Sequence, residues 1–176
     1  MPCTKLSTAR ALDCSRGIGG IQTLYIAHRE DVTAITTDVD GTISAFTMAS
    51  GRKFFEFKME KETALFTNPP IGNVANGSQY FDEILTIVFN QPDAATRNQI
   101  AILAKSNLIV IAKTSNNTFR LLGEENDGLV LNGGEGGSGT AAGDRNGYSL
   151  QLRGFASAPA KFVDDAVITS TLITFA

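Results

Sequence analysis

The stretch 78–124 reads SQYFDEILTIVFNQPDAATRNQIAILAKSNLIVIAKTSNNTFRLLGE, and it contains the signals that decide the fold. Residues 78–90 alternate with a period of two, which predicts a long β-strand because successive strand side chains point to opposite faces. One face carries Phe81, Leu85, Ile87 and Phe89, and the other carries Tyr80, Ile84 and Val88. A β-sheet built around this strand is therefore expected.

One helix is predicted directly after this strand, over about 14 residues. Asn90 is expected to cap it, Pro92 suits its first turn, and Asp93 favours the positive end of the helix dipole. Its apolar stripe consists of Ile100, Leu103 and Ala104. Such a stripe predicts that the helix packs against the sheet with one face.

Short β segments separated by Gly, Asn, Asp and Ser make up most of the remaining chain. The predicted strands are 24–27, 42–47, 53–60, 107–114, 118–124, 129–132 and 147–154. On the inward faces of two of them lie Phe55, Phe57 and Met59, and Tyr148, Leu150 and Leu152. The pattern predicts a mainly β chain, an antiparallel β-sandwich or barrel with one flanking α-helix. We expect a single domain over residues 1–176, with a flexible N-terminal segment 1–17 and a glycine-rich loop over 132–146.

Composition and charge limit the classes of function. A net charge of −3 and a pI near 5.1 argue against a surface that grips DNA phosphates, because such binding needs clustered Lys and Arg. No stretch approaches the roughly 20 apolar residues that span a bilayer, and the first residues lack a secretory signal core. We therefore expect no membrane anchor. Cys3 and Cys14 allow one disulfide, although a reduced pair is the simpler interpretation.

The glycine-rich segment contains Gly134, Gly136 and Gly139 at the G-x-G-x-x-G spacing of a dinucleotide-binding turn. Such a turn needs a helix after the glycines, and here GDRNGYSLQL alternates as a strand. No Lys-Ser or Lys-Thr pair closes the loop as in a P-loop. We therefore predict a flexible connector and no bound cofactor.

The segment TTDVDGTI, residues 36–43, allows two interpretations. D-x-D-G-T resembles the nucleophile loop of haloacid-dehalogenase-type phosphatases, with Asp38 and Asp40 as nucleophile and proton carrier. Asp-Gly is also a common hairpin turn, and the short segment before it together with a single downstream helix favours the hairpin. Because His28 is the only histidine and has no orienting partner nearby, we do not expect an enzyme.

The end of the chain, AVITSTLITFA over 166–176, is uncharged and rich in β-branched residues. It is either an internal strand of the same sheet or an edge strand completed by a neighbouring subunit, because it lacks the Lys or Pro that usually blocks an edge. The candidate inter-subunit edge consists of Val167, Ile168, Leu172, Ile173 and Phe175.

Four segments together resemble virion structural proteins of tailed bacteriophages, of the tail-tube kind. They are GIGGIQTLYIA, MASGRKFFEFKMEKETALFT, the run from YFDEILTIVFN to LVLNGG, and AAGDRNGYSLQLRGFASAPAKFV, within about residues 17–163. The resemblance implies a β-sandwich or barrel with a flanking helix, hexameric stacked rings, and an acidic channel through which phage DNA passes without specific binding. It implies other tail proteins as partners, a place in the virion tail after assembly in the host cytoplasm, and no catalytic residues. Neck, tail-terminator and baseplate rings share this fold and stay open as alternatives.

The resemblance also suggests roles for individual residues. Candidate lumen carboxylates are Glu56, Glu60 and Glu62, on the polar face of their strand, although this face could equally meet outer solvent. Loops over 67–77 and 132–146 are expected to reach the adjacent ring or to be simple exposed loops. The candidate inter-ring residues are Asn68, Pro69, Pro70, Asn73, Gly134, Gly137 and Arg145.

Overall fold

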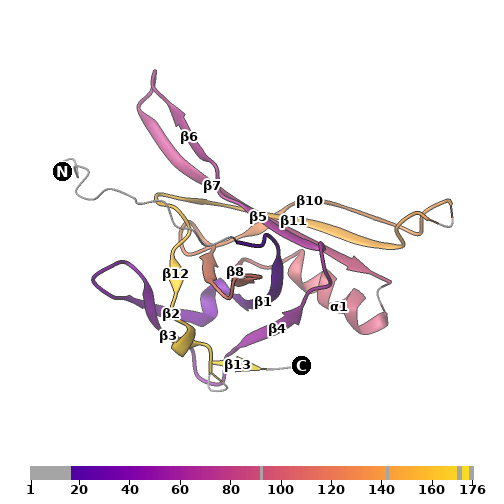
Figure 1. Ribbon diagram of the computed structural model, residues 1–176, viewed down its shortest axis with the longest axis horizontal. Helices are drawn as coiled ribbons and strands as arrows, with labels where there is room; N and C mark the ends of the chain where they lie inside the picture. Colours follow the sequence, from indigo (N-terminus) through magenta and orange to yellow (C-terminus); the bar gives the residue numbers. More distant parts are fainter. Residues whose placement is uncertain (1–16, 92, 142, 170–171, 175–176) are drawn as a thin grey trace.

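The computed structural model describes residues 17–91, 93–141, 143–169 and 172–174, which form two β-sheets and one α-helix (Figure 1). The main sheet has eight strands in the order β13-β4-β1-β8-β9-β12-β3-β2. Their bounds are β13 Ile173–Thr174, β4 Phe54–Lys58, β1 Ile21–His28, β8 Leu108–Thr114, β9 Phe119–Leu122, β12 Phe162–Val163, β3 Ile43–Met48 and β2 Val32–Thr37. β13 and β2 are its two edges, so this sheet does not close into a barrel.

The second sheet, here called the arm sheet, has the order β10-β11-β7-β5, with β6 also paired to β7. Its strands are β5 Ala64–Thr67, β6 Pro70–Asn73, β7 Ser78–Asn90, β10 Val130–Gly137 and β11 Gly147–Ala156. All pairings in this sheet are antiparallel, and the main sheet has two parallel contacts, β12 with β3 and β13 with β4. The predicted fold class, a largely antiparallel β-sandwich with one helix, is confirmed.

Two apolar cores hold the sheets. The first lies between the sheets, where Leu24 and Val110 of the main sheet share one cluster with Leu85 and Leu152 of the arm sheet. The second covers the other face of the main sheet, around Phe54. Because both faces of β1 and β8 are covered, their sequences are nearly continuous apolar runs rather than alternating ones.

The helix α1, Ala94–Leu103, crosses from the arm sheet to the main sheet and adds Ile100 and Leu103 to the first core. Its N-cap is Asp93, whose carboxylate accepts a hydrogen bond from the backbone N–H of Thr96 at 2.7 Å. The backbone N–H of Thr96 lowers the pKa of Asp93. The prediction that Asn90 caps a longer helix is wrong, because Asn90 still belongs to β7 and pairs with Gly147.

Both long loops expected from the sequence are largely β-hairpins. Residues 133–137 pair with β11 from Gly133↔Gln151 to Gly137↔Gly147, so the prediction of a flexible glycine-rich loop over 132–146 is wrong for this part. The glycines permit close packing, since a Cβ on Gly134 would lie 2.4 Å from the Ser149 carbonyl oxygen. Residues 70–73 likewise form β6, which pairs with the first part of β7.

The C-terminal segment folds back onto its own chain. A 3₁₀ turn spans Asp165–Val167, and the described strand contains only Ile173 and Thr174. Leu172 and Ile173 are buried in the second core, at 8% and 1% exposure, and Val167 and Ile168 pack against it. β13 does lie at a sheet edge, but these apolar side chains are used inside the subunit. The predicted edge residue Phe175, the cysteines and almost all of segment 1–17 lie outside the described residues.

The Asp38–Gly41 segment is the turn of the β2–β3 hairpin, as the hairpin interpretation predicted. Asp38 Oδ1 accepts hydrogen bonds from the backbone N–H groups of Asp40 and Thr42 at 3.0 and 2.9 Å, and Gly41 has a positive φ of 80°. The loop therefore joins two antiparallel strands, whereas the phosphatase loop follows a strand of a parallel sheet.

The two aspartates should differ in their effect on stability. Asp38→Ala removes both turn hydrogen bonds and should lower the free energy of unfolding by about 1 kcal/mol. Asp40→Ala should change it by less than about 0.5 kcal/mol, as expected for an exposed turn residue. Urea unfolding of the two variants measures this difference, and equal losses would contradict the turn assignment.

Candidate assembly surface

The arm sheet extends beyond the body of the molecule at both ends of β7 (Figure 1). At about 3.3 Å per residue, the thirteen residues of β7 span roughly 43 Å. Its first part forms a hairpin with β6, here called the β6–β7 arm, and its last part runs beside the β10–β11 arm. One strand thus supports two projecting hairpins that point in different directions.

The two faces of the arm sheet differ in chemistry. The strand register places Leu85 and Leu152 on the inner face, against the first core. The outer face carries Leu65, Thr67, Ile84, Thr86, Val88, Val130, Glu135, Ser149, Gln151 and Phe155, together with Asp82 and Arg153. Leu65, Val130 and Phe155 are 59%, 44% and 42% exposed. Hydroxyl, amide and aliphatic groups therefore dominate this face.

Among the described residues, one ion pair crosses the outer face from β7 to β11. Arg153 Nε and Nη2 donate to the two carboxylate oxygens of Asp82, both at 2.8 Å. These hydrogen bonds raise the pKa of Arg153. The guanidinium also lies 4.9 Å from the ring centroid of Phe155, which packs edge-on against Tyr80 at 5.3 Å. The sequence alone does not reveal this cluster, because its members become neighbours only through the β7–β11 register.

Glu83 connects the two sheets at the base of the β6–β7 arm. It is 3% exposed, and its Oε2 accepts the backbone N–H of Gly123, which follows β9, at 2.8 Å. Its Oε1 lies 3.5 Å from the Asn68 side-chain nitrogen, and the buried Asn68 Oδ1 has no partner among the described residues. Burial raises the pKa of Glu83; the Gly123 N–H opposes the rise, and Glu124 and Glu125 add to it.

The edges of the arm sheet are not the same. One edge is β10, which is rich in glycine; the other consists of β5 followed by β6. Within the described residues, neither edge pairs with a further strand. Two different exposed edges can join copies head to tail, because the first edge of one copy can pair with the second edge of the next.

The three predicted lumen carboxylates do not share the face of one strand. Glu56 lies beside Tyr25 on the main sheet, and its side chain is only 9% exposed. Burial raises the pKa of Tyr25, and the nearby charges of Glu56 and Asp165 raise it further. Glu60 and Glu62 lie in the turn between β4 and β5, where Glu60 accepts a hydrogen bond from Asn90 at 2.7 Å and Glu62 has a positive φ of 64°. The prediction of a common strand face is therefore wrong, because β4 ends at Lys58.

The predicted inter-ring residues are placed on the two arms. Asn68 and Pro69 lie at the base of the β6–β7 arm, where the Pro69 carbonyl accepts the Asp82 N–H at 3.0 Å. The others are Pro70 and Asn73 in β6, Gly134 and Gly137 in β10, and Arg145 in the turn of the β10–β11 arm. That turn is held by Asp144, whose carboxylate accepts the N–H groups of Thr140 and Ala141. A contact with another ring stays a prediction for all of them.

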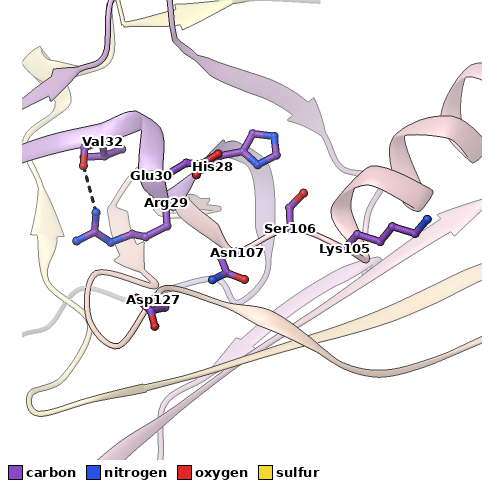
Figure 2. A pocket seen from close by; sticks show the side chains of 8 residues that line it. All are labelled: His28, Arg29, Glu30, Val32, Lys105, Ser106, Asn107 and Asp127. Atoms are coloured by element: carbon purple, nitrogen blue, oxygen red, sulfur yellow. Dashed lines mark hydrogen bonds between the residues drawn. The ribbon is translucent and has the colours of Figure 1, made fainter.

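A pocket near His28 is lined mainly by polar and charged side chains (Figure 2). His28, Arg29 and Lys105 point in different directions, and Arg29 donates to the carbonyl of Val32 at 3.2 Å and to that of Glu124 at 3.1 Å. No group of three His, Cys, Asp or Glu residues suited to a metal occurs among the described residues. Within the same part of the chain, no helix has the length and apolar character needed to span a bilayer.

Comparison with known proteins gives no relative: no family model, curated protein or solved structure matches the chain.

Proposed function

We propose that the protein is a structural subunit of a phage tail tube, which forms stacked rings around a channel that conducts DNA. The observation that carries the proposal is the arm sheet, a sheet with two different unpaired edges from which two hairpins project. The family resemblance in the sequence suggested this class, and the arm sheet supplies surfaces that suit it.

Edge-to-edge pairing would use β10 of one copy and β5 of the next. Such a contact is heterologous, so repeated copies close into a ring when the rotation between neighbours allows it. Backbone hydrogen bonds would supply much of the contact, as in other cases of strand addition. Since Leu172 and Ile173 are buried in the subunit and Val167 and Ile168 pack against the same core, β10 and β5 replace the C-terminal segment in the proposal.

The outer face of the arm sheet would then line the channel. Among the described residues of this face, Arg153 is the only cation and is already bonded to Asp82, and Glu135 is the remaining charge. A wall of hydroxyl, amide and aliphatic groups with one net negative charge per copy offers DNA phosphates no cation to bind. In the proposal, Glu135 therefore takes the lumen role that the sequence suggested for Glu56, Glu60 and Glu62. The projecting arms would reach the next ring.

Negative-stain microscopy of the purified protein over a range of concentration and salt tests the proposal. We expect rings or tubes with a central hole. Single rings that never stack would favour a neck, terminator or baseplate position. Protein that stays monomeric at high concentration, both alone and after addition of preformed tail tips, would contradict the proposal.

A further inference from the structure

A groove beside the helix lies at the base of the β2–β3 hairpin. It has a volume of about 820 Å³, and its apolar wall includes Phe55, Phe57 and Ile102. Phe55 and Ile102 are 55% and 49% exposed and line the same concave surface. This size is in the range of pockets that enclose ligands as large as a short peptide turn.

The exposed charges around this groove are positive. Arg52 is 64% exposed, while its partner Asp31, at 3.4 Å, is 15% exposed. Glu56 also lines the groove, but its side chain is 9% exposed and is paired with Lys58 at 3.6 Å. Lys53 is exposed on the rim. The carboxylates thus lie below the surface, and a partner would meet the cations first.

The tip of the β2–β3 hairpin has the complementary chemistry. Val39 is fully exposed, at 102%, and stands between Asp38 and Asp40. Because Asp38 folds the turn by accepting two backbone N–H groups, the apolar side chain is presented between two carboxylates on a fixed loop. The other fully exposed valine, Val74 at the tip of the β6–β7 arm, stands in an uncharged turn and lacks this complementarity.

The groove and the tip of one chain cannot meet. Asp31 and Arg52 flank the base of the hairpin, where Val32 pairs with Met48, and the tip lies beyond Thr37 and Ile43. Six strand residues separate the two ends by roughly 20 Å. We propose that the groove binds the β2–β3 tip of a second copy of this chain, with Val39 in the apolar groove and Asp40 facing Arg52. This contact lies outside the arm sheet and therefore goes beyond the proposed ring pairing.

Disulfide trapping tests the contact. In a Cys3→Ser, Cys14→Ser background, Val39→Cys with Ile102→Cys should give a ladder of covalent multimers on oxidation, because every chain then has one tip and one groove. Val74→Cys with Ile102→Cys is the matched control and should give at least about tenfold less ladder. A third variant, Ile102→Cys with both native cysteines kept, tests whether the N-terminal segment, which carries Cys3 and Cys14, occupies the groove instead.

The cross-linking results show which segment occupies the groove. The proposal would be overturned if the Val39–Ile102 pair gave no ladder at the highest soluble concentration. It would also be overturned if the Val74–Ile102 pair, or Ile102→Cys with the native cysteines, gave an equal ladder. A charge exchange gives a second test: Asp40→Lys or Arg52→Asp alone should reduce the Val39–Ile102 ladder about tenfold, and a mixture of the two should restore a ladder in which the two variants alternate. Lys61→Asp, a reversal at an exposed turn residue, should have no effect. Because disulfide trapping does not require ring formation, absence of a ladder is distinguishable from failure of the tube proposal.

Discussion

A variant with lysine at both Gly133 and Gly137 should fold normally and no longer form rings. A Cβ at either glycine would meet nothing within 4 Å, and neither residue has a positive φ, so the subunit can accept the new side chains. In a ring, both lysines of every copy would lie on the channel wall, beside the edge that pairs with the next copy. Charged lysines on an edge strand also oppose strand addition. Microscopy and light scattering at low salt should therefore detect only subunits.

Salt and position provide the controls for this variant. At about 1 M salt the Debye length falls to roughly 3 Å, so part of the assembly should return if repulsion between lysines is the cause. Gly19→Lys, outside the arm sheet and also in open space, should assemble as the unmodified chain does. Rings formed by the double variant at low salt, with an unchanged unfolding midpoint, would show that β10 takes no part in the subunit contact.

The sequence predicted best those elements that a local apolar pattern or a turn signal defines. β7 has the bounds that the 78–90 pattern predicted, and β8, β9 and the Asp38–Gly41 turn lie where local signals placed them. These elements follow from local physics, since alternation and turn chemistry act over a few residues. The helix was found as well, but its cap was misplaced because β7 continues to Asn90.

The candidate surface was harder to predict, because it depends on register. Over residues 133–137, β10 has a side chain only at Glu135, and its strand conformation there comes from pairing with β11. Asp82 and Arg153 are 71 residues apart, and Glu83 reaches a backbone N–H 40 residues away. Composition cannot reveal such partners. A signal was available at Asp82-Glu83, since two acidic residues inside an apolar strand need partners when they are buried.

Glu83→Gln should stabilise the protein at pH 8 and leave its stability at pH 4 nearly unchanged. Burial raises the pKa of Glu83 above the unfolded value of about 4.3. A raised folded-state pKa contributes stability that is fully present below the unfolded pKa and is lost as the pH rises through the folded pKa. Glutamine has no charge to bury, can accept the Gly123 N–H as the carboxylate does, and can donate to Asn68 Oδ1 if that amide turns over. The difference should therefore grow with pH and then level off, at about 1–3 kcal/mol.

Urea unfolding from pH 4 to pH 8 measures this difference, and two variants separate charge from packing. Glu62→Gln, at an 84% exposed side chain, should follow the pH profile of the unmodified chain. Glu83→Ala should be less stable at every pH, because it removes the contact with Asn68 and leaves the buried Gly123 N–H without its acceptor. If Glu83→Gln were the less stable protein at pH 8, the ionised carboxylate would be the form that the two sheets bind best. The connection between the sheets would then depend on the negative charge of Glu83 and not on its burial as a neutral acid.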